Sequence, residues 1–168
     1  MTLRIGHGYD IHRLEAGRRL FLGCIEIPFD RGLLGHSDGD VAAHALADAM
    51  LGAAGLGDLG QHFPESDPTT RGMSGKRLLE ETSRKIQAAG FEFVHGDLTI
   101  VAEAPRLSPH RDAMIEAMLA AMPAALTPAG AGFLGLKART NEGLDAVGEG
   151  RAIAAYAVVL LRGRGGAQ

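Results

Sequence analysis

The sequence lacks the features that would place it outside the soluble globular proteins. Cys24 is the only cysteine in 168 residues, which excludes an internal disulfide and a thiolate metal cage. The longest apolar run, Ala152 to Leu161, has about half the length of a membrane-spanning helix. The N-terminus carries no apolar stretch of signal-peptide length. We therefore expect a cytoplasmic protein without a membrane partner.

Positive charge and aromatic side chains are also scarce. Seventeen Lys and Arg stand against twenty Asp and Glu, a formal net charge of −3, so the chain has no basic excess and we expect no nucleic-acid partner. There is no Trp, with two Tyr and six Phe, whereas glycine occurs 24 times. A core of Ala, Leu, Ile and Val buries little area per residue, which favours oligomerisation as a source of further buried surface.

The length predicts a single domain, residues 1–168, with a frayed tail over 163–168. Residue patterns predict strands at 3–12, 91–101, 132–138 and 152–162, and a small hairpin over 19–28 that turns near Gly23. They predict helices at 40–54, capped by Ser37 or Asp38, at 74–89, and from 109 or 110 to 122, with a loop over 55–68. This order predicts an α/β (α+β) sandwich, with helices on one face of a mixed four-stranded sheet.

Histidines and carboxylates cluster near the N-terminus. Asp10 and His12 lie two apart on a predicted strand, so both point to one face. His44 lies on the following helix, one turn after Asp40 and one turn before Asp48. A carboxylate with two imidazoles suits a catalytic zinc with an open fourth position, and Asp48 is placed to accept the spare N–H of His44. By spacing alone, a helical histidine is more often packed or solvated than a metal ligand.

Polar loops supply further candidates. The segment 36–40, which includes His36 and Ser37, runs into a helix N-terminus and suits either phosphate binding or plain capping. The segment 58–67 is either a solvated loop or a flap that binds the hydroxyls of a polyol, through Asp58, Gly60, Phe63, Glu65 and Asp67. Segments 102–110 and 137–142 each follow a strand, a position that favours ligand contact but is also typical of ordinary connections.

Five stretches of sequence carry a specific resemblance. They are RIGHGYDIH at 4–12, GHSDGDVAAHALADA at 35–49, GDLGQHFP at 57–64, AEAPRL at 102–107 and KARTNE at 137–142. In this order and over nearly the whole chain, they resemble the 2-C-methyl-D-erythritol 2,4-cyclodiphosphate synthase family of the non-mevalonate isoprenoid pathway. The resemblance implies a phosphorus–oxygen lyase that converts 4-diphosphocytidyl-2-C-methyl-D-erythritol 2-phosphate to the cyclic 2,4-diphosphate and CMP, by attack of the substrate's 2-phosphate on its β-phosphorus.

The resemblance also implies an assembly and a set of site residues. The assembly is a homotrimer whose sheets face the trimer axis and whose active sites lie between subunits. Each subunit would hold one zinc ion on Asp10, His12 and His44, and a Mg²⁺ or Mn²⁺ ion on Glu142 with the substrate diphosphate. His36 and Thr140 match positions credited with transition-state stabilisation, and Lys137 would neutralise charge beside them. Residues expected to bind the cytidine diphosphate are Ala102, Arg106, Leu107, Ser108, Arg139 and Asn141, while Ser37 and the segment 58–67 would bind the methylerythritol phosphate.

The chain departs from the family at three places. Arg106 stands where many members have Lys, and Arg139 and Asn141 replace two threonines of the common Thr-Thr-Thr-Glu run. Glu149 and Arg151 exchange the two charges of the usual Arg-Gly-Glu, which preserves an ion pair but alters the apolar cavity expected along the trimer axis.

Two other functions compete with the cyclase. One is a metal-dependent phosphohydrolase in which a metal-bound water attacks. The other is a trimeric binding protein with a structural metal, although a three-ligand site with an open position argues against that interpretation.

Overall fold

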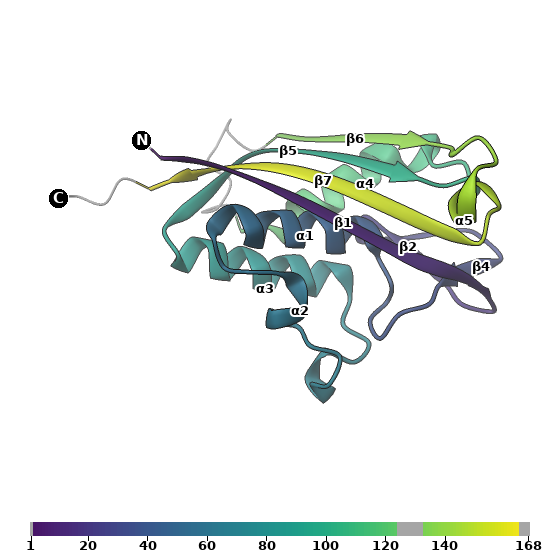
Figure 1. Ribbon diagram of the computed structural model, residues 1–168, viewed down its shortest axis with the longest axis horizontal. Helices are drawn as coiled ribbons and strands as arrows, with labels where there is room; N and C mark the ends of the chain where they lie inside the picture. The colour runs from purple at the N-terminus through teal and green to yellow at the C-terminus, as the bar shows by residue number, and fades with distance from the viewer. Residues whose placement is uncertain (1, 124–132, 165–168) are drawn as a thin grey trace.

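A mixed five-stranded sheet carries the fold in this computed structural model, which describes residues 2–123 and 133–164 (Figure 1). The strand order is β4 (Arg31–Leu33), β1 (Leu3–Ala16), β7 (Ala152–Gly163), β5 (Phe91–Val101) and β6 (Phe133–Arg139). Strands β5 and β6 pair in parallel and the other neighbours pair antiparallel. Strands β2 (Leu20–Leu22) and β3 (Ile25–Ile27) form the predicted hairpin apart from the sheet.

The predicted sandwich is confirmed, but the sheet has five strands rather than the four predicted. The additional strand β4 has three residues, too few for an alternating pattern, and it pairs with the end of β1 through Leu14 and Leu33. Residue 132, the expected start of β6, lies outside the described residues, as do residues 165–168. Gly163 still belongs to β7 and the N–H of Arg164 donates to the carbonyl of Gly90, so a frayed tail cannot begin before residue 165.

Three helices cover one face of the sheet: α1 (Val41–Ala54), α3 (Gly75–Ala88) and α4 (Arg111–Ala121). Helix α1 lies between strands β1 and β7 on one side and α3 on the other, which explains why nearly all of its residues are buried. Two glycines allow this close approach, because a Cβ at Gly6 would lie 1.9 Å from the carbonyl oxygen of Ala49, and a Cβ at Gly8 would lie 2.1 Å from that of Ala45. The approach brings α1 within side-chain reach of β1.

The N-cap of α1 is Asp40, not Ser37 or Asp38 as predicted. Its carboxylate accepts hydrogen bonds from the N–H groups of Ala42 and Ala43. Ser74, the first residue of the predicted helix, is the N-cap of α3 and accepts from the N–H of Arg77.

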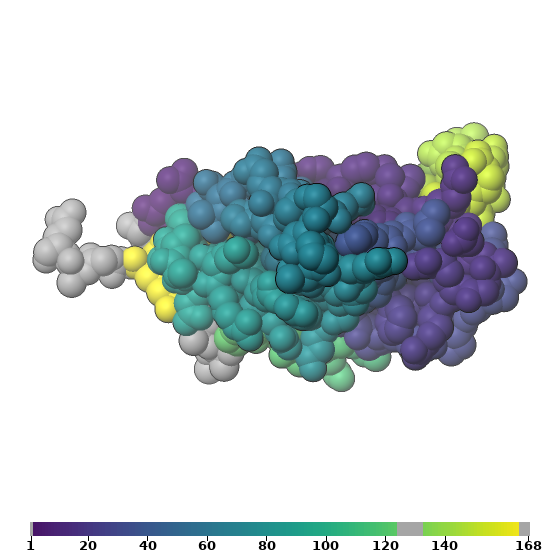
Figure 2. All heavy atoms as spheres, turned by 90° about the horizontal axis from the view of Figure 1, so that it is seen from below, coloured from purple at the N-terminus to yellow at the C-terminus, as the bar shows by residue number. Residues whose placement is uncertain are grey.

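The segment between α1 and α3 is not entirely a loop. It contains α2 (Leu59–His62) and the 3-10 turn η1 (Pro68–Thr70), and it projects from the helical layer on the side away from the sheet (Figure 1). The same segment stands forward in the view from the helical side (Figure 2). Two further short elements are η2 (Ser108–His110) and α5 (Asp145–Gly148). Within the described part of the chain, no helix has the length and apolar character needed to cross a membrane.

The other face of the sheet is rich in exposed apolar side chains. Leu14 of β1 and Leu134 and Leu136 of β6 turn into the core beneath the helices. The alternate positions face outward, and large side chains there stay accessible: Leu3, Ile5, Tyr9 and Ile11 on β1, and Tyr156 and Val158 on β7. The most exposed of them, Ile5, retains 75% of its accessible surface, which is unusual for isoleucine.

Candidate active site

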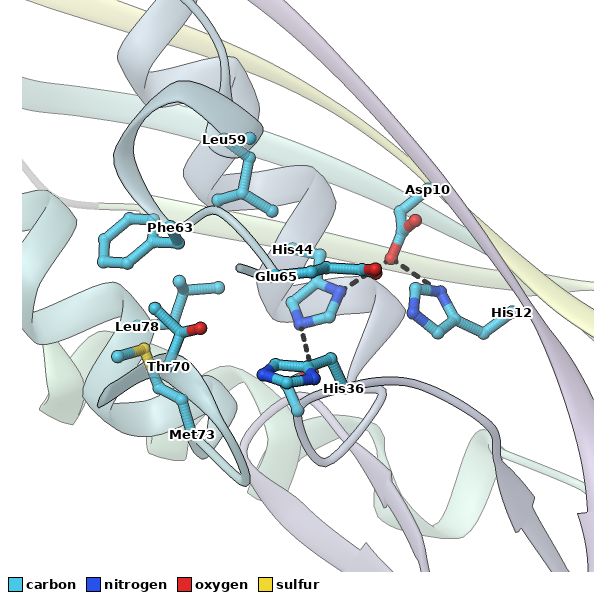
Figure 3. A pocket seen from close by; sticks show the side chains of 12 residues that line it. Asp10, His12, His36, His44, Leu59, Phe63, Glu65, Thr70, Met73 and Leu78 are labelled. Carbon is cyan, nitrogen blue, oxygen red and sulfur yellow. Dashed lines mark hydrogen bonds and ion pairs between the residues drawn. The ribbon is translucent and has the colours of Figure 1, made fainter. Parts of the chain in front are cut away.

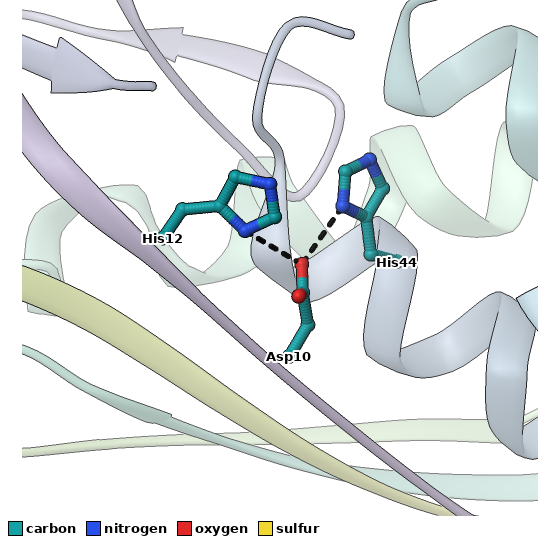
Figure 4. Close-up of side chains that lie close together, drawn as sticks. All are labelled: Asp10, His12 and His44. Carbon is teal, nitrogen blue, oxygen red and sulfur yellow. Dashed lines mark hydrogen bonds and ion pairs between the residues drawn. The ribbon is translucent and has the colours of Figure 1, made fainter. Parts of the chain in front are cut away.

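Strand β1 and helix α1 together place one carboxylate and two imidazoles in contact (Figure 4). Asp10 and His12 project from β1 toward α1, where His44 lies one turn from the N-cap. The Nδ1 of His44 lies 2.8 Å from Oδ2 of Asp10, and the Nδ1 of His12 lies 3.0 Å from the same oxygen. Potential ligand atoms of the three residues all lie within 4.8 Å of one another. The predicted cluster is thereby confirmed as a spatial group.

The imidazoles offset the effect of burial on the pKa of this carboxylate. Burial alone would raise the pKa of Asp10, but the neighbouring rings of His12 and His44 outweigh it and lower the pKa to about 2. Asp10 is therefore an anion at neutral pH, as a metal ligand must be.

The donor set fits a divalent transition metal. The Nδ1 of His12 is buried and, despite its distance from Asp10, is not aligned for a hydrogen bond to any described residue. A buried ring nitrogen without a partner is costly, and an ion between the three side chains would supply one. One carboxylate oxygen and two imidazole nitrogens are the ligands of many catalytic zinc sites, which leave a fourth position open.

The remaining ring nitrogen of His44 has a different partner from the one predicted. Its Nε2 lies 3.1 Å from the Oγ of Ser37. Asp48, expected to bind this ring, instead accepts a hydrogen bond from the N–H of Leu59 at 2.9 Å and holds the start of α2. The predicted Asp48–His44 bond is therefore wrong, because α2 returns to the helix surface and occupies the carboxylate.

A cavity of about 230 Å³ opens beside the cluster (Figure 3). Its walls come from β1, the β4–α1 loop, α1, the α2 segment and α3. It includes eight of the predicted site residues: Asp10, His12, His36, Ser37, His44, Gly60, Phe63 and Glu65. The Nε2 of His36 is buried there without a hydrogen-bond partner among the described residues. Leu59, Thr70, Met73 and Leu78 complete the lining and were not predicted, since their side chains carry no signal specific to a site.

Two predicted residues of the flap support its backbone rather than line the cavity. Asp58 caps α2 by accepting from the N–H of Gln61, and Asp67 caps η1 through the N–H and hydroxyl of Thr69. Both caps stabilise the backbone of the segment between α1 and α3, which carries Gly60 and Glu65.

A second, more open pocket of about 340 Å³ lies at the ends of β5 and β6. Six predicted residues line it: Ala102, Arg106, Leu107, Ser108, Arg139 and Thr140. Glu103, which belongs to the predicted segment 102–110 but was given no role of its own, lines the pocket and accepts a hydrogen bond from the N–H of Asn141 at 2.6 Å. This bond ties the two pocket-forming segments together. The only signal for it was the position of Glu103 directly after a strand.

The remaining predicted residues lie around the second pocket. Asn141 directs its side-chain amide to the carbonyl of Leu144 and to Asp145, and Glu142 has a positive φ of 52° in the same turn. Lys137 is paired with Asp97 on the sheet face opposite the helices, so within one chain the structure does not bring it to the metal cluster. Arg151 pairs with Glu149 at 2.6 Å, which confirms the predicted exchange of charges within an ion pair.

The two pockets occupy different strands of one sheet. Asp10 is level with Ala155, Ala155 with Ile100, and Ile100 with Ala138, which lines the second pocket. Three strand spacings, roughly 14 Å, therefore separate β1 from β6. The residues expected to hold the two ends of one substrate lie apart in the single chain.

Comparison with known proteins agrees with this architecture. The YgbB family profile matches residues 3–162. The 2-C-methyl-D-erythritol 2,4-cyclodiphosphate synthase of Desulfosudis oleivorans is 50% identical over 95% of this chain and 92% of its own. A solved synthase in its CDP-bound form is 42% identical, with a TM-score of 0.81 over 95% of this chain and all of that one. The bifunctional IspDF of Campylobacter jejuni is 32% identical, with a TM-score of 0.86, and this chain spans 42% of it. The chain belongs to the YgbB family, and the family resemblance inferred from its motifs is confirmed.

Proposed function

We propose that this protein converts 4-diphosphocytidyl-2-C-methyl-D-erythritol 2-phosphate to 2-C-methyl-D-erythritol 2,4-cyclodiphosphate and CMP, in isoprenoid precursor synthesis in the cytoplasm. One observation carries the proposal. In a chain of this family, Asp10, His12 and His44 converge beside a cavity that also holds His36 and Ser37. The synthases to which the chain is similar carry this activity in their names, and one was solved with CDP.

The reaction requires no nucleophilic side chain. An oxygen of the substrate's 2-phosphate, ionised at neutral pH, forms a bond to the β-phosphorus. The bond from that phosphorus to the oxygen bridging it to the α-phosphorus breaks, and the bridging oxygen leaves with CMP. No water is consumed. The protein must therefore position two anionic groups and stabilise the charge that spreads between them.

Side chains of both pockets supply this positioning. The Nε2 of His36, which has no partner in the described part of the chain, is available to a phosphate oxygen in the first cavity. In the second pocket, the Arg106 guanidinium and the Thr140 hydroxyl are available to the cytidine diphosphate. A cation near the diphosphate stabilises the leaving CMP electrostatically.

Two metal ions complete the proposed site. Asp10, His12 and His44 would hold zinc, and Glu142 would hold Mg²⁺ or Mn²⁺ together with the diphosphate. When bound, such ions attract and orient phosphate oxygens and neutralise their charge.

The proposed active unit is a homotrimer with sites between subunits. The pockets lie roughly 14 Å apart in the sheet of one chain, and the sheet face opposite the helices exposes large apolar side chains of β1 and β7. Packing of this face around an axis would bury those side chains and let a neighbour supply the second pocket. Lys137 lies on that face.

The test is product analysis in ¹⁸O-labelled water. Purified protein supplied with zinc and magnesium should release CMP and form a cyclic diphosphate without ¹⁸O, as measured by ³¹P NMR and mass spectrometry. A phosphohydrolase would give an open-chain phosphate that contains ¹⁸O, and a binding protein would give no CMP; either result overturns the proposal. His44→Ala should abolish turnover, whereas Arg84→Ala, exposed on α3 and outside both cavities, should retain it.

A further inference from the structure

We propose that Ser37 is a positioning residue for the metal centre: its hydroxyl oxygen accepts the Nε2–H of His44 and so directs the Nδ1 lone pair of that ring to the ion. The inference deepens the proposed function, because it concerns the same metal site. It assigns Ser37 a task that is independent of substrate.

The geometry leaves Ser37 as the acceptor for this ring. His44 is 8% exposed, so solvent cannot serve both of its nitrogens. Its Nδ1 faces Oδ2 of Asp10 at 2.8 Å, within the metal cluster, and its Nε2 faces the Ser37 Oγ at 3.1 Å. A buried N–H without an acceptor costs about 1–3 kcal/mol.

The hydrogen bonds at Ser37 leave its oxygen able to accept from the His44 ring. The N–H of Gly39 donates to the same Oγ at 3.1 Å. A hydroxyl oxygen has two lone pairs, so it can accept from Gly39 and from His44 together and still keep its own hydrogen to donate. The turn that delivers the Gly39 N–H requires glycine, since φ is +75° and a Cβ would lie 2.8 Å from that of Leu33.

The tautomer follows once Nδ1 binds the ion, because a ligating nitrogen carries a lone pair and no hydrogen. A neutral imidazole carries one N–H, and if that hydrogen is on Nε2, the lone pair is on Nδ1 and points at Asp10 and His12. A ligand histidine is usually fixed in this way by a carboxylate, a carbonyl or water. Here a serine replaces them, and because Ser37 also lines the cavity, its free hydroxyl hydrogen is available to a bound phosphate.

A role confined to the substrate makes a different prediction. If Ser37 only contacts the phosphate, its removal leaves the affinity for metal unchanged in the absence of substrate. If Ser37 orients His44, removal weakens metal binding before any substrate is added.

The experiment measures zinc affinity of the substrate-free protein by competition with a chromophoric chelator. Ser37→Ala should bind zinc about 10–100-fold more weakly, and Ser37→Thr, which keeps a hydroxyl, should stay within about threefold of the unmodified protein. Ser108→Ala is the matched control, because it removes a serine hydroxyl from the other pocket and should leave zinc affinity unchanged. Equal zinc affinity of Ser37→Ala and the unmodified protein overturns the proposal, as does absence of zinc binding by the unmodified protein.

A second measurement uses the unmodified protein and so tests the proposal even if the alanine variant fails to fold. Long-range ¹H–¹⁵N NMR of the zinc-loaded, unmodified protein should show the His44 hydrogen on Nε2, and a hydrogen on Nδ1 overturns the proposal. The reaction itself is tested separately by CMP release. If the protein passes both tests and yet releases no CMP, the proposed function is refuted and the role of Ser37 at the metal centre is retained.

Discussion

The carboxylate of Asp40 accepts a hydrogen bond from the backbone N–H of Cys24, 2.6 Å away in the turn between β2 and β3. The N–H of Gly23 donates to the other oxygen at 2.9 Å, as do Ala42 and Ala43 at the start of α1. Asp40 is fully buried. It therefore joins the hairpin to the helix that carries His44, and its support of the metal ligands acts through the backbone.

Asp40→Ala should destabilise the protein by about 2–4 kcal/mol, because it leaves buried N–H groups without acceptors and removes a cap. The measurement is the free energy of unfolding in urea. Asp58→Ala is the control, since Asp58 caps α2 at the surface and its loss should cost about 1 kcal/mol or less. Equal losses would contradict the structural role assigned to Asp40.

Asp48→Ala separates support of α2 from support of the metal ligands. Asp48 holds the N–H of Leu59 rather than the His44 ring, so zinc affinity should stay unchanged. The α2 segment carries Gly60 and Phe63 of the first cavity, and its loosening should raise KM several-fold. A large loss of zinc affinity would restore the sequence-based prediction that Asp48 fixes His44.

The metal cluster was predictable because its geometry follows from regular periodicity. Alternation along β1 places Asp10 and His12 on one face, and helix α1 can bring only one face of its surface, that of His44, to that strand. The contacts that sequence reasoning missed connect irregular segments. Leu59 returns to Asp48 through a four-residue helix, and Glu103 meets Asn141 across two loops.

Strand β4 shows the same limit for the fold. Its three residues pair with β1 through backbone groups, which carry no side-chain signature. The long strands and helices, by contrast, match the predictions to within a few residues, because each buries one face and its pattern records that burial. The predicted strand over 152–162 is confirmed by pairing on both sides of β7.

Glu103→Ala should weaken CDP binding tenfold or more, because the Asn141 N–H loses its acceptor and the two segments of the second pocket separate. Glu103→Gln keeps a carbonyl oxygen at the same place and should lose less. Isothermal titration with CDP measures both, and zinc affinity serves as the control that neither variant should change. Identical CDP affinity in both variants and the unmodified protein would refute the role of Glu103.

Val158→Asp should dissociate the oligomer while leaving the fold of the subunit intact. Val158 is about half exposed on the sheet face opposite the helices, and a carboxylate there would be buried without a partner if the copies pack through this face. Sedimentation velocity should show a trimer for the unmodified protein and smaller species for the variant, with loss of CMP release. Lys76→Asp, on the outer surface of α3, provides the control charge change. A variant that keeps the unmodified mass would refute packing through this face.

Gly8→Ala tests the approach of α1 to β1 on which the metal cluster depends. A Cβ at Gly8 would lie 2.1 Å from the carbonyl oxygen of Ala45, a backbone atom that cannot move without shifting the helix. Since α1 carries His44 and β1 carries Asp10, the shift should both destabilise the protein by several kcal/mol and separate the ligands. The expected observation is a large fall in the midpoint of urea unfolding together with loss of zinc affinity.

Gly52→Ala is the matched substitution on the same pair of elements, because it adds the same methyl group where nothing lies within 4 Å. Gly52 is exposed within α1, where alanine is the better helix former by about 1 kcal/mol. This variant should therefore be more stable than the unmodified protein and bind zinc with unchanged affinity. If Gly8→Ala is tolerated as well as Gly52→Ala, close packing of α1 on β1 does not hold Asp10 and His44 together.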